Sequence, residues 1–329
     1  ELIEFSKNLL RVEAALRKVW PYISALPELI NEKTGKLHTV FNQNGAKTGR
    51  FSSGGEDSFN IQNQPKGARK MYVAPPGYVL VGADFSAQEI RCITNYSREP
   101  ILLEAFEKGR DSYATLASDY FGKPYEQCYK NPDGSDTEER KQMKTVMLAS
   151  IYGTTKYGLA DQLGVTPDEA QEFLDSFFDK YKYIKRWIDE THAELKRTGF
   201  VWIGDKYRKR RLPDARSKVR GYDPKRNRAL RQGPNGRVQG LSAIQTKKTL
   251  VALDKVCKER GWYLWAPIHD EVITLMPEDF TREDIRIYEE IMTQTFVFGD
   301  VKNATDIEIM KRWGEGVSVD EWFAKGDEN

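Results

Sequence analysis

Residues 81–91 of this chain read VGADFSAQEIR, and residues 268–272 read IHDEV. In each segment an aspartate, Asp84 or Asp270, ends an apolar run that is typical of a strand. Residues 78–81 are apolar at every position, which predicts a strand covered on both faces. Two strand-end carboxylates from distant parts of the chain can meet at one sheet edge and share a hard divalent cation. The two segments therefore predict a sheet that carries a cation site.

A helix with basic side chains is predicted between these segments. Arg140, Lys144, Leu148 and Tyr152 follow one another at intervals of four residues, so they lie on one stripe of a helix. An Arg and a Lys on one stripe are suited to holding a triphosphate. Such a stripe is more often a solvated face, and a single strand-end Asp is more often structural, so the prediction rests on the three segments together.

Composition sets broad limits on the class of protein. The chain has 329 residues, of which 39% are hydrophobic and 30% are charged, with a net charge of +2, as in ordinary globular proteins. Residues 206–237 contain thirteen Lys or Arg against two Asp, which favours either a solvated loop or contact with a polyanion. No apolar run approaches the roughly 18 residues that span a bilayer, so we expect a soluble protein without a membrane partner. Three scattered cysteines without a CxxC pattern argue against a disulfide framework and against zinc, and favour a reducing compartment.

Local patterns predict further helices and hairpins. Apolar residues recur at helical spacing in residues 1–30, and helical patterns cover residues 89–121. Residues 31–65 are polar and rich in glycine, with only short extended pieces. Hairpins are predicted at residues 200–205 and 262–275, the second with its turn at the IHDEV segment.

Two helix starts are predicted from capping patterns. Ser135 with Glu138 fits a capping box for the helix of the basic stripe. Thr166 with Glu169 fits a second box, followed by a helix that is predicted to run towards Thr198.

The three segments, in this order, resemble motifs A, B and C of the family A DNA polymerases, the DNA polymerase I type. TGRFSS at residues 48–53, NIQN at residues 60–63 and RLPD at residues 211–214 also resemble family segments. The resemblance covers nearly the whole chain. It implies an α+β fold built as a right hand, with a palm of antiparallel sheet and helices, mainly helical fingers, and a thumb that is largely missing.

The resemblance implies four parts of the chain. Residues 1–30 are the end of the thumb or a connecting helix, residues 31–110 the first part of the palm with motif A, residues 111–200 the fingers with motif B, and residues 201–329 the second part of the palm with motif C. Because the sequence begins with Glu1 rather than Met, we expect it to be part of a longer protein whose thumb lies before this residue.

The resemblance also implies a metal site and a proton donor. Asp84, Asp270 and the backbone carbonyl of Phe85 would bind two Mg²⁺ ions, for which Mn²⁺ can substitute. Lys144 would contact the incoming phosphates and donate a proton to the leaving pyrophosphate. Asp84, Asp270 and Lys144 are thus the implied catalytic residues, and Glu271 is expected outside the metal ligands.

A nucleotide site follows from the same resemblance, with the implied residues Arg140, Lys144, Leu148, Tyr152, Glu89 and Tyr113. Arg140 would hold the γ-phosphate, Tyr152 would stack near the templating position, and Glu89 would act as a steric gate against a ribose 2′-hydroxyl. The sequence departs from the family pattern at Leu148, where an aromatic residue is usual, and at Tyr113, where a histidine often stands. Ala87 replaces a customary glutamine. These departures indicate a divergent member, such as a phage or plasmid enzyme.

The implied DNA-binding residues are Arg50, Gln62, Arg231, Asn235, Gln239 and His269. Minor-groove acceptors are nearly the same for every correct base pair, so Arg, Asn and Gln side chains can check geometry there without reading sequence. We therefore expect sequence-independent binding of primer-template DNA.

The implied function is template-directed addition of dNTPs to a primer 3′-hydroxyl, with release of pyrophosphate. Primer-template DNA and dNTPs are the implied partners, together with a processivity factor or another replication protein, in the cytoplasm of a bacterium or a phage-infected host. A single-subunit RNA polymerase is one alternative, against which Glu89, Gln62 and the set of Arg231, Asn235 and Gln239 count. A catalytically silent DNA-binding relative is a second, and a two-metal nuclease, which would need a further acidic cluster, is a third.

Overall fold

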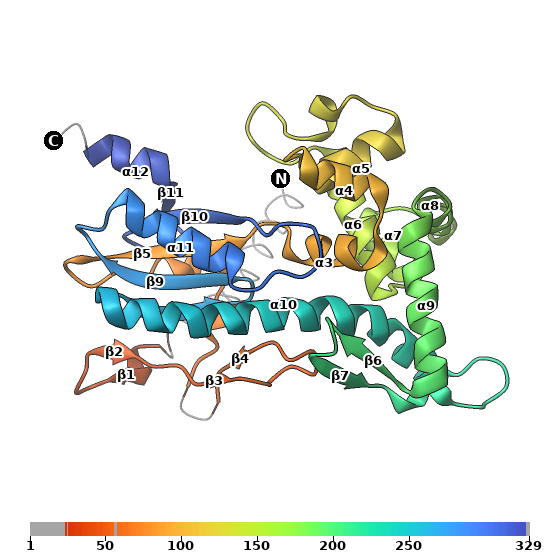
Figure 1. Cartoon of the computed structure of the whole chain (residues 1–329), viewed down its shortest axis with the longest axis horizontal. Coiled ribbons are helices and arrows are strands. Elements are labelled where there is room, and N and C mark those ends of the chain that lie inside the picture. The colour runs from red at the N-terminus through yellow and green to blue at the C-terminus, as the bar shows by residue number, and fades with distance from the viewer. Residues whose placement is uncertain (1–23, 25, 56–57, 327–329) are drawn as a thin grey trace, which may run out of the picture. The chain divides into compact units, whose positions relative to one another are not determined.

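The computed structural model describes residue 24 and residues 26–55 and 58–326, which form two compact units (Figure 1). Of the described residues, the sheet unit comprises residues up to 86, residues 246–295 and residues 304–326, and the helical unit comprises residues 87–245 and 296–303. This mixture of helices and strands confirms the α+β class. The boundaries after residues 86 and 245 do not coincide with those expected at 110 and 200, and the four-part division stays a prediction. Most of the helix predicted in residues 1–30 lies outside the described residues.

The helices (α), 3₁₀ helices (η) and strands (β) have the following bounds. The sheet unit contains η1 (Pro27–Leu29), β1 (Ile30–Asn31), β2 (Lys36–Leu37), β3 (Phe41–Asn42), β4 (Ser52–Ser53), η2 (Ile61–Asn63), α2 (Lys66–Arg69), β5 (Tyr78–Phe85), β8 (Tyr263–Ile268), β9 (Glu271–Pro277), α11 (Arg282–Gln294), β10 (Thr305–Met310), β11 (Gly316–Ser318) and α12 (Val319–Gly326). The helical unit contains α3 (Gln88–Ser97), α4 (Pro100–Glu107), α5 (Ser112–Phe121), η3 (Tyr125–Cys128), α6 (Glu138–Tyr152), α7 (Lys156–Leu163), α8 (Pro167–Lys180), α9 (Lys182–Thr198), β6 (Phe200–Ile203), β7 (Arg208–Arg211) and η4 (Pro213–Arg216). Helix α10 (Pro224–Arg260) belongs to the helical unit up to residue 245 and to the sheet unit beyond it.

A five-stranded antiparallel sheet, in the order β11-β10-β5-β9-β8, is the centre of the sheet unit. In the central strand β5, Val79, Leu80 and Val81 are completely buried, which confirms the predicted strand with two covered faces. The register places Asp84 opposite Glu271 of β9 on one side and opposite Asp306 of β10 on the other.

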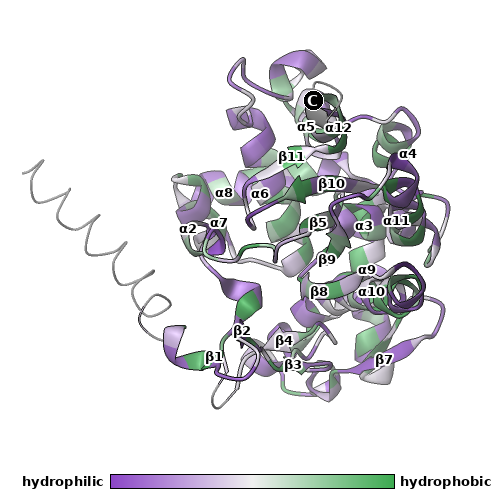
Figure 2. Cartoon of the chain, turned by 90° about the vertical axis from the view of Figure 1, so that its left-hand side faces the viewer, coloured by the Kyte–Doolittle hydropathy of each residue, from purple (hydrophilic) through white to green (hydrophobic). Residues whose placement is uncertain are grey.

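Side-chain alternation separates the two faces of β5. Val81 packs in a core with residues of α10 and α11, whereas Leu80 packs on the opposite face with Trp313. Because side chains alternate with a period of two along a strand, Gly82 and Asp84 share the face of Leu80. Strands β5 and β9 consist mainly of hydrophobic residues (Figure 2).

The helical unit has its own core, formed mainly by α3 to α9. The second predicted helix start is confirmed, because the Thr166 side chain and Glu169 form a capping box with Pro167 in the first turn. The helix does not continue to Thr198, since α8 ends at Lys180 and α9 begins two residues later. Between them Tyr181 is buried and donates a hydrogen bond from its hydroxyl to the carbonyl oxygen of residue 116, at 3.1 Å.

The first predicted capping box is wrong. Helix α6 starts at Glu138, and its N-cap is Thr137, whose hydroxyl accepts a hydrogen bond from the Arg140 amide. The Ser135 hydroxyl instead donates to Asp133 in the preceding turn, at 2.6 Å. A local side-chain bond in this turn thus moves the helix start by two residues.

Both predicted hairpins are present, as β6–β7 and as β8–β9. Among the described residues, no helix is both long and apolar enough to cross a membrane.

Tyr288 of α11 links helix and sheet beneath β9. Its buried hydroxyl donates to the Val272 carbonyl at 2.8 Å and accepts from the Thr274 hydroxyl at 3.2 Å. We expect Tyr288→Phe to lower the free energy of unfolding by about 1 to 3 kcal/mol, because two buried polar groups lose a partner. Chemical denaturation measures this change. The exposed Tyr222 is the control, and an equal loss in Tyr222→Phe would contradict the assignment.

Candidate functional site

The structure brings Asp84 and Asp270 together, as the sequence predicts. Asp84 is the penultimate residue of β5, and Asp270 lies in the two-residue turn between β8 and β9. The Phe85 amide donates to the Asp270 carbonyl oxygen at 3.2 Å, which ties this turn to the end of β5. His269, in the same turn, has a left-handed backbone with φ 58°. Both aspartates line one cleft of about 640 Å³ within the sheet unit.

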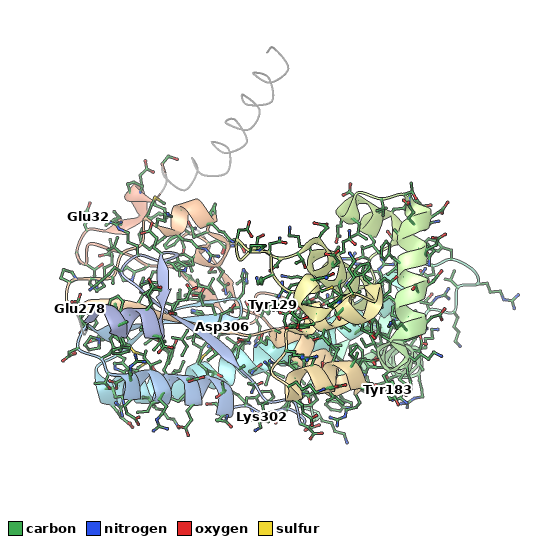
Figure 3. All side chains as sticks on the ribbon, turned by 90° about the horizontal axis from the view of Figure 1, so that it is seen from above. Glu32, Tyr129, Tyr183, Glu278, Lys302 and Asp306 are labelled. Carbon is green, nitrogen blue, oxygen red and sulfur yellow. The ribbon has the colours of Figure 1, made fainter. Side chains whose placement is uncertain are left out.

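Three further carboxylates line this cleft, namely Glu271, Asp306 and Glu308. Asp306, labelled in Figure 3, lies opposite Asp84 on β10 and accepts a hydrogen bond from the Ser86 hydroxyl at 2.7 Å. Asp306 and Glu308 are not among the residues predicted from the sequence. Their signal is the alternation of acidic and apolar residues in TDIEIM, residues 305–310, which puts both carboxylates on one face of a strand.

Desolvation and neighbouring charges raise the pKa of two of these carboxyl groups, Asp84 and Glu271. The Asp84 side chain reaches the solvent of the cleft, but the surrounding protein partly desolvates its carboxyl group. This desolvation is the largest cause that raises the pKa of Asp84 to about 7, and the negative charges of Asp270, Glu271 and Asp306 contribute further. Desolvation also raises the pKa of Glu271 to about 7, and the positive charge of Arg69 opposes that rise. The cleft therefore favours a bound positive charge.

The donor set fits a magnesium ion that is completed by substrate. In the part of the chain that the structure describes, no three carboxylate, imidazole or thiolate side chains are grouped so as to hold a metal alone. Mg²⁺ is commonly bound by one or two carboxylates together with waters and substrate phosphates. Asp84 and Asp270, with the carbonyl of Phe85 at the end of β5, are hard oxygen donors of this kind.

Three predicted DNA-binding residues of the sheet unit, Arg50, Gln62 and His269, lie close to the β8–β9 turn. Gln62 is only 4% exposed, and its side-chain amide donates to the Pro267 carbonyl at 3.2 Å. Partial desolvation and the nearby charge of Arg50 lower the pKa of His269. The structure thus places Gln62, Arg50 and His269 in one region, where Gln62 supports the turn rather than presenting its side chain.

The basic stripe on α6 is present, but its two cations differ in environment. Arg140 donates from Nε and from one terminal nitrogen to both oxygens of Asp111, at 3.0 and 2.7 Å, and it also pairs with Asp136. Its side chain is only 13% exposed. Lys144 is exposed, with its ammonium 5.8 Å from the ring centroid of the buried Tyr113. Lys144 is therefore the accessible cation of the stripe.

The other end of α6 joins two predicted nucleotide-binding residues. The Tyr152 hydroxyl donates a hydrogen bond to the Glu89 carboxylate of α3. Leu148, one turn earlier, is partly buried against the core of the helical unit. Glu89 is thus held by a side chain 63 residues away.

Arg231, Asn235 and Gln239 follow one stripe of α10 in the helical unit, and all three are half-buried. The stem of Arg231 crosses Gly153, the left-handed residue that ends α6, so closely that a β-carbon there would collide with it. The Oδ1 atom of Asn235 is buried and has no hydrogen-bond partner in the described structure. An unpaired acceptor of this kind is costly unless a ligand satisfies it.

Comparison with known proteins identifies the family. Residues 4–315 match the model of DNA polymerase family A. This chain belongs to DNA polymerase family A. DNA polymerase I of Chloroflexus aurantiacus is 33% identical over 302 residues, covering 89% of this chain and 30% of that protein. The thermostable DNA polymerase I of Thermus aquaticus is 32% identical, covering 82% of this chain and 32% of that protein.

A solved structure of the same family extends the likeness to the fold. The POL domain of Pol1 from M. smegmatis, in complex with DNA primer-template and dNTP, superposes with a TM-score of 0.83 at 27% identity, over 94% of this chain and 53% of that chain. The chain thus spans about a third of the curated family A relatives it matches. Family membership implies dependence on a divalent metal ion.

Repulsion in the cleft leads to a prediction about cation binding. In cation-free buffer at pH 8, Asp84→Asn is expected to raise the free energy of unfolding by up to about 1 kcal/mol, because it removes one of several crowded charges that cleft solvent screens only in part. In the parent protein, added Mg²⁺ should stabilise the fold, and this gain should shrink in the variant. Thermal unfolding with and without Mg²⁺ measures both effects.

The exposed Asp279, outside the cleft, provides the matched control. If Asp279→Asn reproduces the behaviour of Asp84→Asn, the stabilisation by Mg²⁺ does not come from this cleft.

Proposed function

We propose that this chain is a DNA-directed DNA polymerase that adds dNTPs to a primer 3′-hydroxyl on a DNA template and releases pyrophosphate. The observation that carries the proposal is the meeting of Asp84 and Asp270 in one carboxylate-lined cleft of a family A chain. On this proposal the sheet unit corresponds to the palm, and the helical unit corresponds to the fingers.

Asp84, Asp270 and the Phe85 carbonyl would hold two Mg²⁺ ions, or Mn²⁺ in their place. When bound, such ions lower the pKa of the attacking hydroxyl and neutralise the charge of the triphosphate. The chain's own part is to orient these oxygens. The bond from the Phe85 amide to the Asp270 carbonyl supports that role, because it couples the turn to the strand that carries Asp84.

Lys144 is proposed as the phosphate contact of α6. Its exposed ammonium can bind the incoming triphosphate and give a proton from Nζ to the leaving pyrophosphate. Tyr113 lies beside both α6 cations, with the Arg140 guanidinium 5.5 Å and the Lys144 ammonium 5.8 Å from its ring centroid. The ring can limit their rotamers where the family often has a histidine.

Arg140 would have to exchange partners in order to bind a γ-phosphate. Its bidentate bond to Asp111 uses the same parallel donors that recognise a phosphate. A triphosphate must therefore compete with a carboxylate for this guanidinium. Arg140 is proposed as a phosphate ligand only after that exchange.

Primer-template DNA is proposed as the substrate, because the M. smegmatis relative is described in complex with it and with dNTP. Arg231, Asn235 and Gln239 would contact the duplex, and the unpaired Oδ1 of Asn235 supports such a role. Arg50 and His269 would add contacts from the sheet unit. A processivity factor, other replication proteins and a cytoplasmic location stay predictions.

The decisive experiment is primer extension. With a labelled primer annealed to a longer template, Mg²⁺ and dNTPs, the chain should extend the primer, and Asp84→Ala and Asp270→Ala should each reduce the rate by at least roughly a thousandfold while primer-template binding persists. Offering NTPs in place of dNTPs tests the RNA polymerase alternative. Extension by both variants at the parent rate would refute the metal assignment, and preferred use of NTPs would favour the alternative.

Glu89 is predicted to exclude ribonucleotides, and Tyr152 to hold it in position. Glu89→Ala should raise the kcat/KM for rNTP insertion relative to dNTP insertion by removing the side chain that opposes a 2′-hydroxyl. Tyr152→Phe should raise the same ratio less, since it deletes only the hydroxyl that bonds to Glu89. Single-nucleotide insertion kinetics measure the ratio. An unchanged ratio in Glu89→Ala would assign Glu89 to the start of α3 and no more.

A further inference from the structure

The β6–β7 hairpin of the helical unit has an aromatic, basic face, and its other face carries Val201 and Ile203 opposite Arg210 and Arg208. Its register pairs Phe200 with Arg211 and Trp202 with Lys209. Opposed residues of an antiparallel pair lie on the same face, so these four side chains share one surface. Val201 and Ile203 alternate with them and are completely buried. We call the surface of Phe200, Trp202, Lys209 and Arg211 the outer face of the hairpin.

On the outer face, the Lys209 ammonium is positioned by two aromatic rings. The Lys209 ammonium lies 4.6 Å from the ring centroids of both Phe200 and Trp202. The two rings are 5.9 Å apart and nearly perpendicular, an arrangement that fixes an otherwise flexible cation. Lys209 and Arg211 are exposed, and within the described residues neither forms an ion pair.

The segment that follows the hairpin adds more positive charge. Its loop is held in shape by Arg226, whose guanidinium donates to the carbonyl oxygens of Val219 and Gly221, at 2.8 and 2.5 Å. Tyr222 at its tip is 79% exposed. Asp223 accepts hydrogen bonds from the Ser217 hydroxyl and from the first amides of α10, and it keeps its negative charge. Residues 212–228 contain six Lys or Arg against two Asp, so the segment keeps an excess of positive charge.

We propose that the outer face of the hairpin binds single-stranded nucleic acid. Sequence-independent binding of single strands combines cations that follow the backbone with aromatic rings on which bases stack. Lys209 and Arg211 supply the first element, and Trp202 with Phe200 supplies the second. The identification of this strand as the unpaired part of the template depends on the proposed polymerase function. The proposed binding site itself depends only on the side chains of the hairpin.

Two kinds of substitution separate charge from stacking. The probe is a fluorescein-labelled oligothymidylate of about 16 nucleotides, titrated by anisotropy at several salt concentrations. Lys209→Gln and Arg211→Gln should each weaken binding about tenfold at low salt and lower the slope of log affinity against log salt by roughly 0.7. Trp202→Ala should weaken binding about tenfold at every salt concentration without changing the slope.

A matched control lies on α9. Arg186 covers the ring of Tyr183 at 4.7 Å, but Glu190 lies 3.9 Å from that guanidinium, and Tyr183 is labelled in Figure 3. This pair has the same chemistry with its charge partly balanced, so Tyr183→Ala and Arg186→Gln should leave oligothymidylate binding unchanged. Thermal unfolding reports whether Trp202→Ala is folded. If Trp202→Ala does not fold, the proposal is tested by oligothymidylate binding of the Lys209→Gln and Arg211→Gln variants.

Two results would overturn the proposal. One is parent-like affinity in Lys209→Gln and Arg211→Gln; the other is an equal loss of binding to a blunt duplex, which would make the surface a general phosphate patch. Primer extension by the parent protein is scored separately. If the parent fails to extend a primer but the hairpin variants lose oligothymidylate binding, the polymerase function fails and the binding site stands.

Discussion

The crowding of carboxylates on one face of three neighbouring strands is the constraint on which the sheet unit depends. Asp84, Glu271 and Asp306 occupy adjacent register positions on β5, β9 and β10, and their mutual repulsion favours a bound cation over an empty cleft. The opposite face of the same strands packs against α10 and α11. A rigid apolar layer thus holds together charges that would otherwise separate.

Small residues and backbone bonds make this crowding possible. A β-carbon at Gly82 would lie 2.6 Å from a carboxylate oxygen of Glu271 and 2.9 Å from Met310, so a larger residue would push these side chains into the cleft. The amide of Phe85 fixes the turn that carries Asp270. The position of the proposed metal-binding oxygens is therefore set by backbone pairing, and a change in side chain alone can alter charge without moving the site.

In the helical unit, several charges form ion pairs. Arg140 is neutralised by Asp111, and Arg237 pairs with Glu194. Lys144 and the cations on the outer face of the hairpin are exposed, and Lys144 and Lys209 lie beside aromatic rings. Exposed cations beside aromatic rings suit contact with polyanions, which fits nucleotides and nucleic acid as the proposed partners.

Much of this architecture was determined by the sequence itself. Three predicted features depend only on residues that are close in sequence: the apolar run before Asp84, the basic stripe of α6 and the Thr166 cap. Local periodicity and local hydrogen bonding can therefore be predicted from the sequence. Only the tertiary structure decided that Asp306, 220 residues after Ser86, would stand beside Asp84, and that Asp111 would hold Arg140. Strand register and ion pairing between distant segments depend on how the sheet and helices pack, and this packing cannot be predicted from local sequence.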